Sequence, residues 1–169
     1  MKLTARKLGH SDRNDLLVCT REDGSTTQVA MPRQGVLPHD LLHYVVETAL
    51  PFRHGFLSQV ADGGSIAIDA GMSYVEGPAR HVLESGQVES LVEALQTQLW
   101  AGAFDAEAFL EGARLACESR DLPAPALPGL DLEALLFDRA RQLHDEWLRV
   151  PPQQSLTLEF GRRGAVSPG

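Results

Sequence analysis

The segment Leu37–Leu50, with the sequence LPHDLLHYVVETAL, constrains the fold of this chain most strongly, because it joins a helix start signal to an apolar helical face. Pro38 suits the first turn of a helix, where its missing N–H would have no intrahelical partner. Asp40 adds a negative charge to that turn, which the helix dipole favours. Apolar residues then recur at spacings of three and four: Leu42, Val45, Val46 and Ala49. This pattern predicts an amphipathic helix that packs against a core.

The same helix carries a polar strip made of His39, His43 and Glu47, spaced four residues apart. Side chains at this spacing are neighbours on a helix, about 5–6 Å apart at Cβ. Two imidazoles and a carboxylate so arranged could bind a divalent metal such as zinc, with Asp40 orienting a histidine or a bound water. The structural interpretation is that a polar strip opposite an apolar face is typical of a surface helix, so that Asp40 would be a first-turn charge and His39, His43 and Glu47 would be solvated.

The residues after this helix could complete or shield such a site. Pro51 is expected to end the helix. A second short helix is predicted over Phe52–Ala61, with two glycines at 63 and 64 as its stop signal. Phe56 and its apolar neighbours could cover the polar strip. His54 is the best candidate for a fourth metal ligand, and a surface position after the proline is the competing interpretation.

The H-D-x-x-H pattern from His39 to His43 partly matches several metal motifs. It has Asp40 where H-E-x-x-H has a glutamate that acts as general base. It resembles the H-D pair of HD-type phosphohydrolases, whose further ligands cannot be placed in this chain. It is also similar to the metal motif of a ubiquinone-biosynthesis protein family, which has a glutamate where this chain has Gly55. These partial matches assign no family.

A broader resemblance covers Met1–Phe160. A strand hairpin is followed by GVLPHDLLHYVVE, then by HGFLSQVADGG, and later by a helix ending in DEWLRVPP before SLTLEF. This order resembles a family of uncharacterised bacterial proteins, and Leu37–Gly63 is its most distinctive part. The resemblance implies that the Leu37–Glu47 pattern is a family hallmark, and it carries no established activity.

Alternating segments at both ends of the chain predict an antiparallel sheet. Strands are expected at Lys2–Leu8, Asp15–Arg21 and Thr26–Met31, with an Asp23–Gly24 turn typical of a hairpin. Ser155–Phe160 also alternates and is expected to return to this sheet. We therefore expect an α+β fold, in which a small antiparallel sheet (the N-terminal meander plus the C-terminal strand) packs against four to five helices on one side.

The middle of the chain is predicted to be mainly helical. An irregular loop is expected at Ser65–Gly77, and helices at Pro78–Trp100, at Ala106–Arg120 capped by Asp105, and up to Val150 after a cap at Asp131. The first of these helices could be broken at Gly86, and a proline-rich linker precedes the last. We expect one globular domain over residues 1–160 and a disordered tail over 161–169.

Composition narrows the classes of function. A net charge of −8 and the absence of basic residues clustered with aromatics argue against nucleic acid as a partner. No apolar run reaches the roughly 18 residues that span a bilayer, and the N-terminus has no apolar signal region, so we expect no membrane association and a cytoplasmic location. Cys19 and Cys117 have no metal or redox spacing and are expected to be buried.

Two functions stay open at this point. The first, which we place slightly ahead, is a non-catalytic structural or interaction domain. The second is a divalent-metal-binding, hydrolase-like protein that uses His39, His43 and Glu47, with Asp40 as the catalytic group. The partner is an unknown small molecule or protein, and the oligomeric state is open. Phosphate-binding, dinucleotide-binding and nucleophile-elbow motifs are absent. The two functions differ in whether the polar strip faces a shared recess or open solvent.

Overall fold

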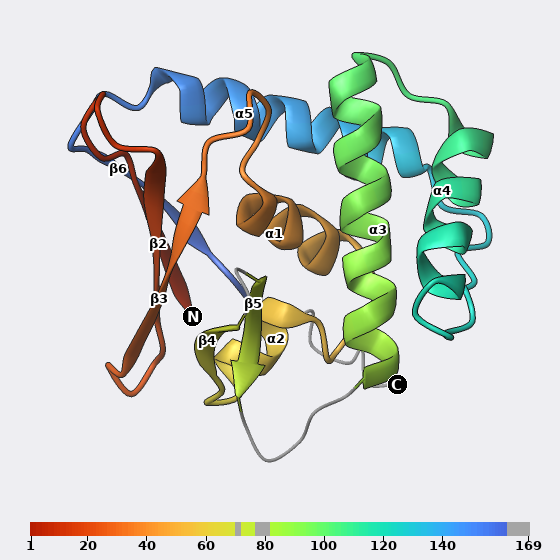
Figure 1. Ribbon diagram of the computed structural model, residues 1–169, viewed down its shortest axis with the longest axis horizontal. Helices are drawn as coiled ribbons and strands as arrows, with labels where there is room; N and C mark the ends of the chain where they lie inside the picture. Colours follow the sequence, from red (N-terminus) through yellow and green to blue (C-terminus); the bar gives the residue numbers. More distant parts are fainter. Residues whose placement is uncertain (70–71, 77–81, 162–169) are drawn as a thin grey trace, which may run out of the picture.

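The computed structural model describes residues 1–69, 72–76 and 82–161 and has an α+β architecture (Figure 1). The strands are β1 (Lys2–Arg6), β2 (Asn14–Thr20), β3 (Thr26–Pro32), β4 (Ser65–Asp69), β5 (Met72–Glu76) and β6 (Ser155–Glu159). The helices are α1 (His39–Ala49), α2 (Phe56–Ala61), α3 (Val82–Ala101), α4 (Ala106–Glu118) and α5 (Arg139–Arg149), and a π-helical segment η1 (Glu133–Asp138) runs directly into α5.

The main sheet has the strand order β3-β2-β1-β6 and is antiparallel throughout. Leu3 pairs with Cys19 on one side and with Leu158 on the other. Alternation buries these three side chains on one face, as period-two patterning requires. Between β2 and β3, Gly24 has a φ of +83°, a conformation that glycine adopts without a Cβ clash. The predicted meander, its hairpin turn and the returning C-terminal strand are confirmed.

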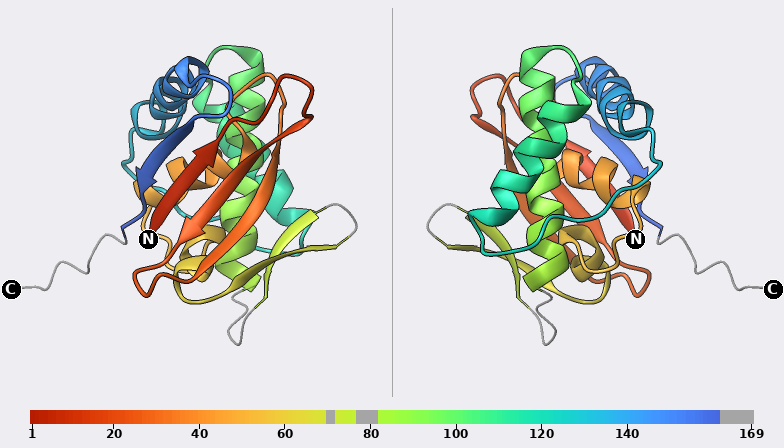
Figure 2. Two further views of the ribbon diagram at one scale, coloured as in Figure 1. Left: turned by 90° about the vertical axis from the view of Figure 1, so that its left-hand side faces the viewer. Right: turned by 90° about the vertical axis from the view of Figure 1, so that its right-hand side faces the viewer.

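All the helices lie on one face of this sheet (Figure 2). Helix α1 sits between the sheet and α3, with η1 and α5 across one end and α2 near the other, while α4 packs on the far side of α3 (Figure 1). Helix α1 therefore has neighbours on almost every side. Leu41 and Leu42, which are adjacent in sequence and point in different directions, both have no exposed surface. The expected one-sided arrangement of helices is confirmed.

Three local expectations differ from the structure. The expected loop after residue 65 is the β4–β5 hairpin, because the β-branched and aromatic residues there favour strands despite the nearby glycines. The second helix begins at Phe56 rather than Phe52. Helix α3 continues through Gly86 without a break. A Cβ at this position would collide with the Leu122 side chain, so the glycine allows the proline-rich linker to pack closely against α3.

Other expectations hold. Asp105 Oδ1 accepts a hydrogen bond from Ala108 N at 2.9 Å, and Asp131 Oδ1 accepts one from Ala134 N at 3.1 Å, so both predicted caps are confirmed. Both cysteines are buried. Among the described residues, no helix is long and apolar enough to cross a membrane. Residues 78–81 of the predicted third helix and the predicted tail from residue 162 onward lie outside the described residues.

Because α1 is surrounded by other elements, replacing a leucine by alanine should lower the free energy of unfolding more on α1 than on the exposed face of α4. Leu42→Ala removes a side chain with no exposed surface and should lower the free energy of unfolding by about 2–5 kcal/mol. Leu110→Ala, on α4, removes one that is 45% exposed and should cost less than about 1 kcal/mol. Urea denaturation of the two variants measures the difference, and equal costs would contradict the placement of α1 at the centre.

Candidate metal centre

The polar strip of α1 is covered rather than solvated. Asp40 and Glu47 are each 6% exposed and His43 is 3% exposed, while the His39 side chain is about a third exposed, at 33%. The surface-helix interpretation predicted that His39, His43 and Glu47 would be solvated, and it is wrong for His43 and Glu47. Asp40, which it treated as a first-turn charge, is buried as well. The reason is tertiary, because side chains from α3 and α2 pack over this strip and bond to it.

Glu89 on α3 reaches both histidines of α1. Its Oε1 lies 3.0 Å from His39 Nε2, and its Oε2 lies 2.9 Å from His43 Nε2. One ligand atom from each of the three side chains lies within 4.8 Å of the others. The two imidazole rings meet edge to face, with centroids 5.1 Å apart. Within the described parts of the chain, no other group of three histidine, cysteine or acidic side chains comes together in this way.

The outer nitrogen of each ring also has a partner. His39 Nδ1 lies 3.1 Å from Gln96 Oε1, and His43 Nδ1 lies 3.2 Å from Glu47 Oε1. Because an amide or carboxylate oxygen can only accept, each Nδ1 must carry a proton and donate it. A neutral ring with its proton on Nδ1 has its lone pair on Nε2. Hydrogen bonds of this kind orient histidines that bind metals.

Glu47 has a supporting position behind His43. Besides the His43 contact, its carboxylate accepts hydrogen bonds from Leu57 N at 3.0 Å and from the N and Oγ of Ser58, both at 2.9 Å. It therefore caps the start of α2, whose own first residues supply no side-chain cap. Gly55 leaves room for this carboxylate, because a Cβ there would collide with it. The sequence predicts Glu47 as the third ligand beside His39 and His43. The structure places its carboxylate against His43 Nδ1, and the acid whose oxygen converges with the two histidines is Glu89.

Asp40 is buried, and the charges of both histidines act on its carboxyl group. Burial raises the pKa of its carboxyl group, and nearby histidines partly offset this. Burial, followed by the neighbouring charge of Asp40, raises the pKa of the Cys19 thiol on β2 to about 12. Among the hydrogen bonds of the described residues, none joins the Asp40 side chain to His39 or His43. Its predicted role in orienting a histidine or a water stays a prediction.

His54 belongs to a different cluster. Its Nδ1 lies 3.1 Å from Glu84 Oε2, and the same oxygen accepts hydrogen bonds from the backbone N of Arg53 and of His54, both at 2.8 Å. Through these contacts, Glu84 links the α1–α2 connection to the first turn of α3. His54 is not in the group formed by His39, His43 and Glu89.

The metal-free cluster is an ion-pair network. Burial alone would lower the pKa of His43, but hydrogen bonds to Glu47 and Glu89 outweigh it and raise that pKa to about 10. The pKa of His39 is raised in the same way, mainly through Glu89. Burial would raise the pKa of Glu89, and its bonds to both histidines instead hold that pKa well below its usual range. At neutral pH, a negative carboxylate thus sits between two rings that favour the protonated form.

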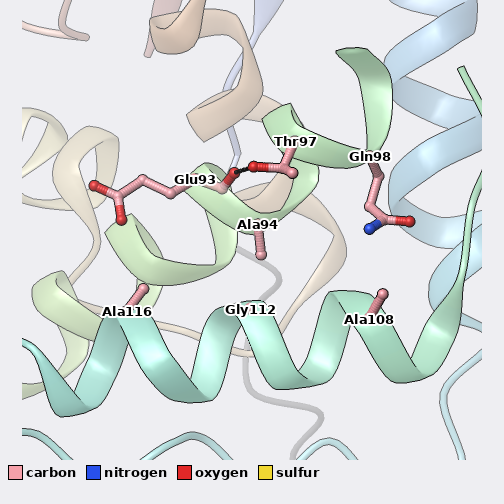
Figure 3. A pocket seen from close by; sticks show the side chains of 7 residues that line it. All are labelled: Glu93, Ala94, Thr97, Gln98, Ala108, Gly112 and Ala116. Atoms are coloured by element: carbon pink, nitrogen blue, oxygen red, sulfur yellow. Dashed lines mark hydrogen bonds between the residues drawn. The ribbon is translucent and has the colours of Figure 1, made fainter. Parts of the chain in front are cut away.

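A shallow groove on the other side of α3 lacks comparable chemistry. It lies between α3 and α4 and is lined mostly by small side chains (Figure 3). Its volume is about 220 Å³. Glu93 is its one ionisable lining residue, and that carboxylate pairs with Arg120 at 2.6 Å. The groove faces α4, whereas Glu89 faces the histidines of α1.

Comparison of the chain with protein-family models, with curated proteins and with solved structures finds no match. Its function must therefore be inferred from the residues of the site.

The raised pKa of His43 predicts how the stability of the metal-free protein depends on pH. An unfolded histidine loses its proton near pH 6.5, whereas folded His43 holds its proton up to about pH 10. The resulting stabilisation is complete below pH 6.5 and is lost as the pH rises through 10. Between about pH 6.5 and 8.5, the free energy of unfolding should fall by up to about 2 kcal/mol.

Urea denaturation in the presence of a chelator measures this fall. His43→Gln cannot hold the proton and should show a flatter pH dependence over the same range. A wild-type stability that rises with pH, or a fall of equal size in the variant, would contradict the assigned protonation of His43.

Proposed function

We propose that the protein binds a divalent transition metal, with zinc the best match, through His39 Nε2, His43 Nε2 and a carboxylate oxygen of Glu89. The observation that carries this proposal is the convergence of these atoms while both Nδ1 atoms are held by acceptors. Two imidazole nitrogens and one carboxylate oxygen are donors that zinc prefers, and other transition metals also accept them.

The separations within the cluster suit an ion after small side-chain movements. Zinc holds its nitrogen and oxygen ligands at about 2.0–2.1 Å, so tetrahedral ligand atoms lie roughly 3.3 Å apart. The two histidine–carboxylate separations, 3.0 and 2.9 Å, are slightly shorter than this. His39 and Glu89 are each a third exposed and can adjust, whereas His43 is fixed by burial and by Glu47.

Three protein ligands are typical of catalytic rather than structural zinc sites, which use four. A metal held by these three residues would lower the pKa of a bound water and so would supply the nucleophile for hydrolysis near neutral pH. His39 and Glu89 are each a third exposed, so water reaches this side of the cluster. The centroid of the Phe56 ring lies 5.3 Å from that of the His43 ring, so Phe56 packs against this histidine. The reaction class that fits best is metal-assisted hydrolysis of a small molecule.

The non-catalytic alternative has its own supporting observation. All four ring nitrogens of His39 and His43 already have hydrogen-bonding partners without a metal. In that interpretation, Glu89 joins α3 to α1 through a partly buried ion-pair network, and the protein works through a binding partner. The two proposals predict different metal contents for the purified protein.

The metal content of the purified protein should depend on each of the three proposed ligands. Tag-free wild-type protein should contain close to one equivalent of zinc or another transition metal by elemental analysis. His43→Ala and Glu89→Gln should lose it, because each removes one of three ligand groups. Glu93→Gln is the matched control, since it lies one turn further along α3 and pairs with Arg120 instead. Wild-type protein without metal, and without a thermal shift on adding zinc, manganese, cobalt or iron(II), would favour the structural alternative.

Metal binding should release protons. Because both rings favour the protonated form in the metal-free cluster, an ion must displace protons to reach Nε2. Apparent zinc affinity should therefore rise between about pH 6 and pH 8. Calorimetry in buffers of different ionisation enthalpy should show one to two protons released per ion. An affinity independent of pH would mean that zinc binds elsewhere.

A further inference from the structure

A second cleft lies away from the metal centre, where the β1–β2 turn, the β3–α1 connection and the end of α5 meet. Its volume is about 470 Å³, within the range of roughly 300–1,000 Å³ typical of small-molecule sites. Part of its wall is apolar and open to solvent, including Val36, Leu148 and Pro151. None of the three proposed metal ligands lines it.

The cleft concentrates positive charge in an acidic protein. The chain carries a net charge of −8, yet the cleft is lined by three permanent cations, Lys7, Arg33 and Arg149, and by a single carboxylate, Asp15. His10 and His144 are also in the lining. A cation-lined recess with low-dielectric walls attracts anions.

Two of these cations, Lys7 and Arg149, form no ion pair with the described residues, whereas Arg33 pairs with Asp15. Arg33 is committed to Asp15, which it contacts at 2.7 and 3.2 Å, and to the carbonyl oxygen of Gly9. Lys7 Nζ donates to Leu148 O at 3.2 Å and lies 5.1 Å from the centroid of the Trp147 ring, which leaves further N–H groups available. The Arg149 side chain is exposed, and no hydrogen bond or ion pair joins it to another of the described residues.

We propose that this cleft binds a small organic anion, with its carboxylate or phosphate group between Lys7 and Arg149 and its apolar part against Val36, Leu148 and Pro151. An ammonium and a guanidinium form charge-assisted hydrogen bonds with either anion. The partial burial of Lys7, which lowers its pKa, is consistent with a cation that gains from a bound anion. The proposal does not depend on the metal centre.

A chain of hydrogen bonds nevertheless connects the two sites. Gln34 lines the cleft, and its Oε1 accepts a hydrogen bond from Gln96 Nε2 at 3.1 Å. The Oε1 of the same Gln96 accepts from His39 Nδ1. A ligand that moved Gln34 would therefore act on the residue that orients His39.

The test is an NMR titration of metal-free, ¹⁵N-labelled full-length protein with four probes: phenyl phosphate, benzoate, phenol and inorganic phosphate. Phenyl phosphate, benzoate or both should give saturable shifts at the amides of Gly35 and Val150, beside the cleft, and none at Gly112 on α4. The anion that binds more tightly identifies the headgroup. Phenol and inorganic phosphate should bind at least about tenfold more weakly, because each lacks half of the recognised chemistry.

Variants locate the contacts. Arg149→Gln and Lys7→Gln should each weaken binding by about tenfold, the effect of one charge-assisted hydrogen bond. Arg149 is exposed, so its variant should fold normally even if Lys7→Gln perturbs the packing of Trp147. Arg141→Gln, an exposed cation of α5 outside the cleft, should bind as the wild type does. No saturable shift, equal binding of phenol, equal binding of inorganic phosphate, or equal affinity in Arg149→Gln would each overturn the proposal.

Discussion

The contact between Glu89 and the two histidines of α1 is the interaction on which the centre of this structure depends. Helix α1 lies between the sheet and α3, so its polar side chains have little water and need protein partners. Glu89 satisfies both Nε2 atoms, Gln96 and Glu47 satisfy the Nδ1 atoms, and the rest of the Glu47 carboxylate caps α2. One network thus joins α1, α2 and α3, and the absence of a side chain at Gly55 makes room for it.

The same network explains why the site suits a metal and why protons compete for it. In the metal-free protein the carboxylate of Glu89 holds protons on His39 and His43, and a cation at the same point would take over the role of those protons. The ion pairs alone are weak evidence for stability, because the free energy lost when charges leave water is about as large as the free energy gained from their attraction. A metal that binds only the folded state would add stability by mass action.

The sequence predicts the local parts of this structure well. The strands of the meander, the Asp23–Gly24 turn and the caps at Asp105 and Asp131 depend on residues near in the sequence, and all are observed. The alternation of Ser155–Phe160 also predicted a strand, and it pairs with β1 as expected. The amphipathic pattern of α1 could not show that other helices cover its polar strip. Spacing brought Glu47 to His43, but Glu89 lies 46 residues beyond His43 on another helix, and its place depends on how α1 and α3 cross. The only local hint was a charged residue beside buried Val88 and Ser90.

The most direct test of the central claim is zinc K-edge X-ray absorption on the full-length protein loaded with one equivalent of zinc. We predict a first shell of nitrogen and oxygen at about 2.0–2.1 Å, with the outer-shell scattering of two imidazoles that falls to one imidazole in His43→Ala. A first shell of oxygen alone, a sulfur ligand, or an unchanged spectrum in His43→Ala would show that His39, His43 and Glu89 do not bind the ion.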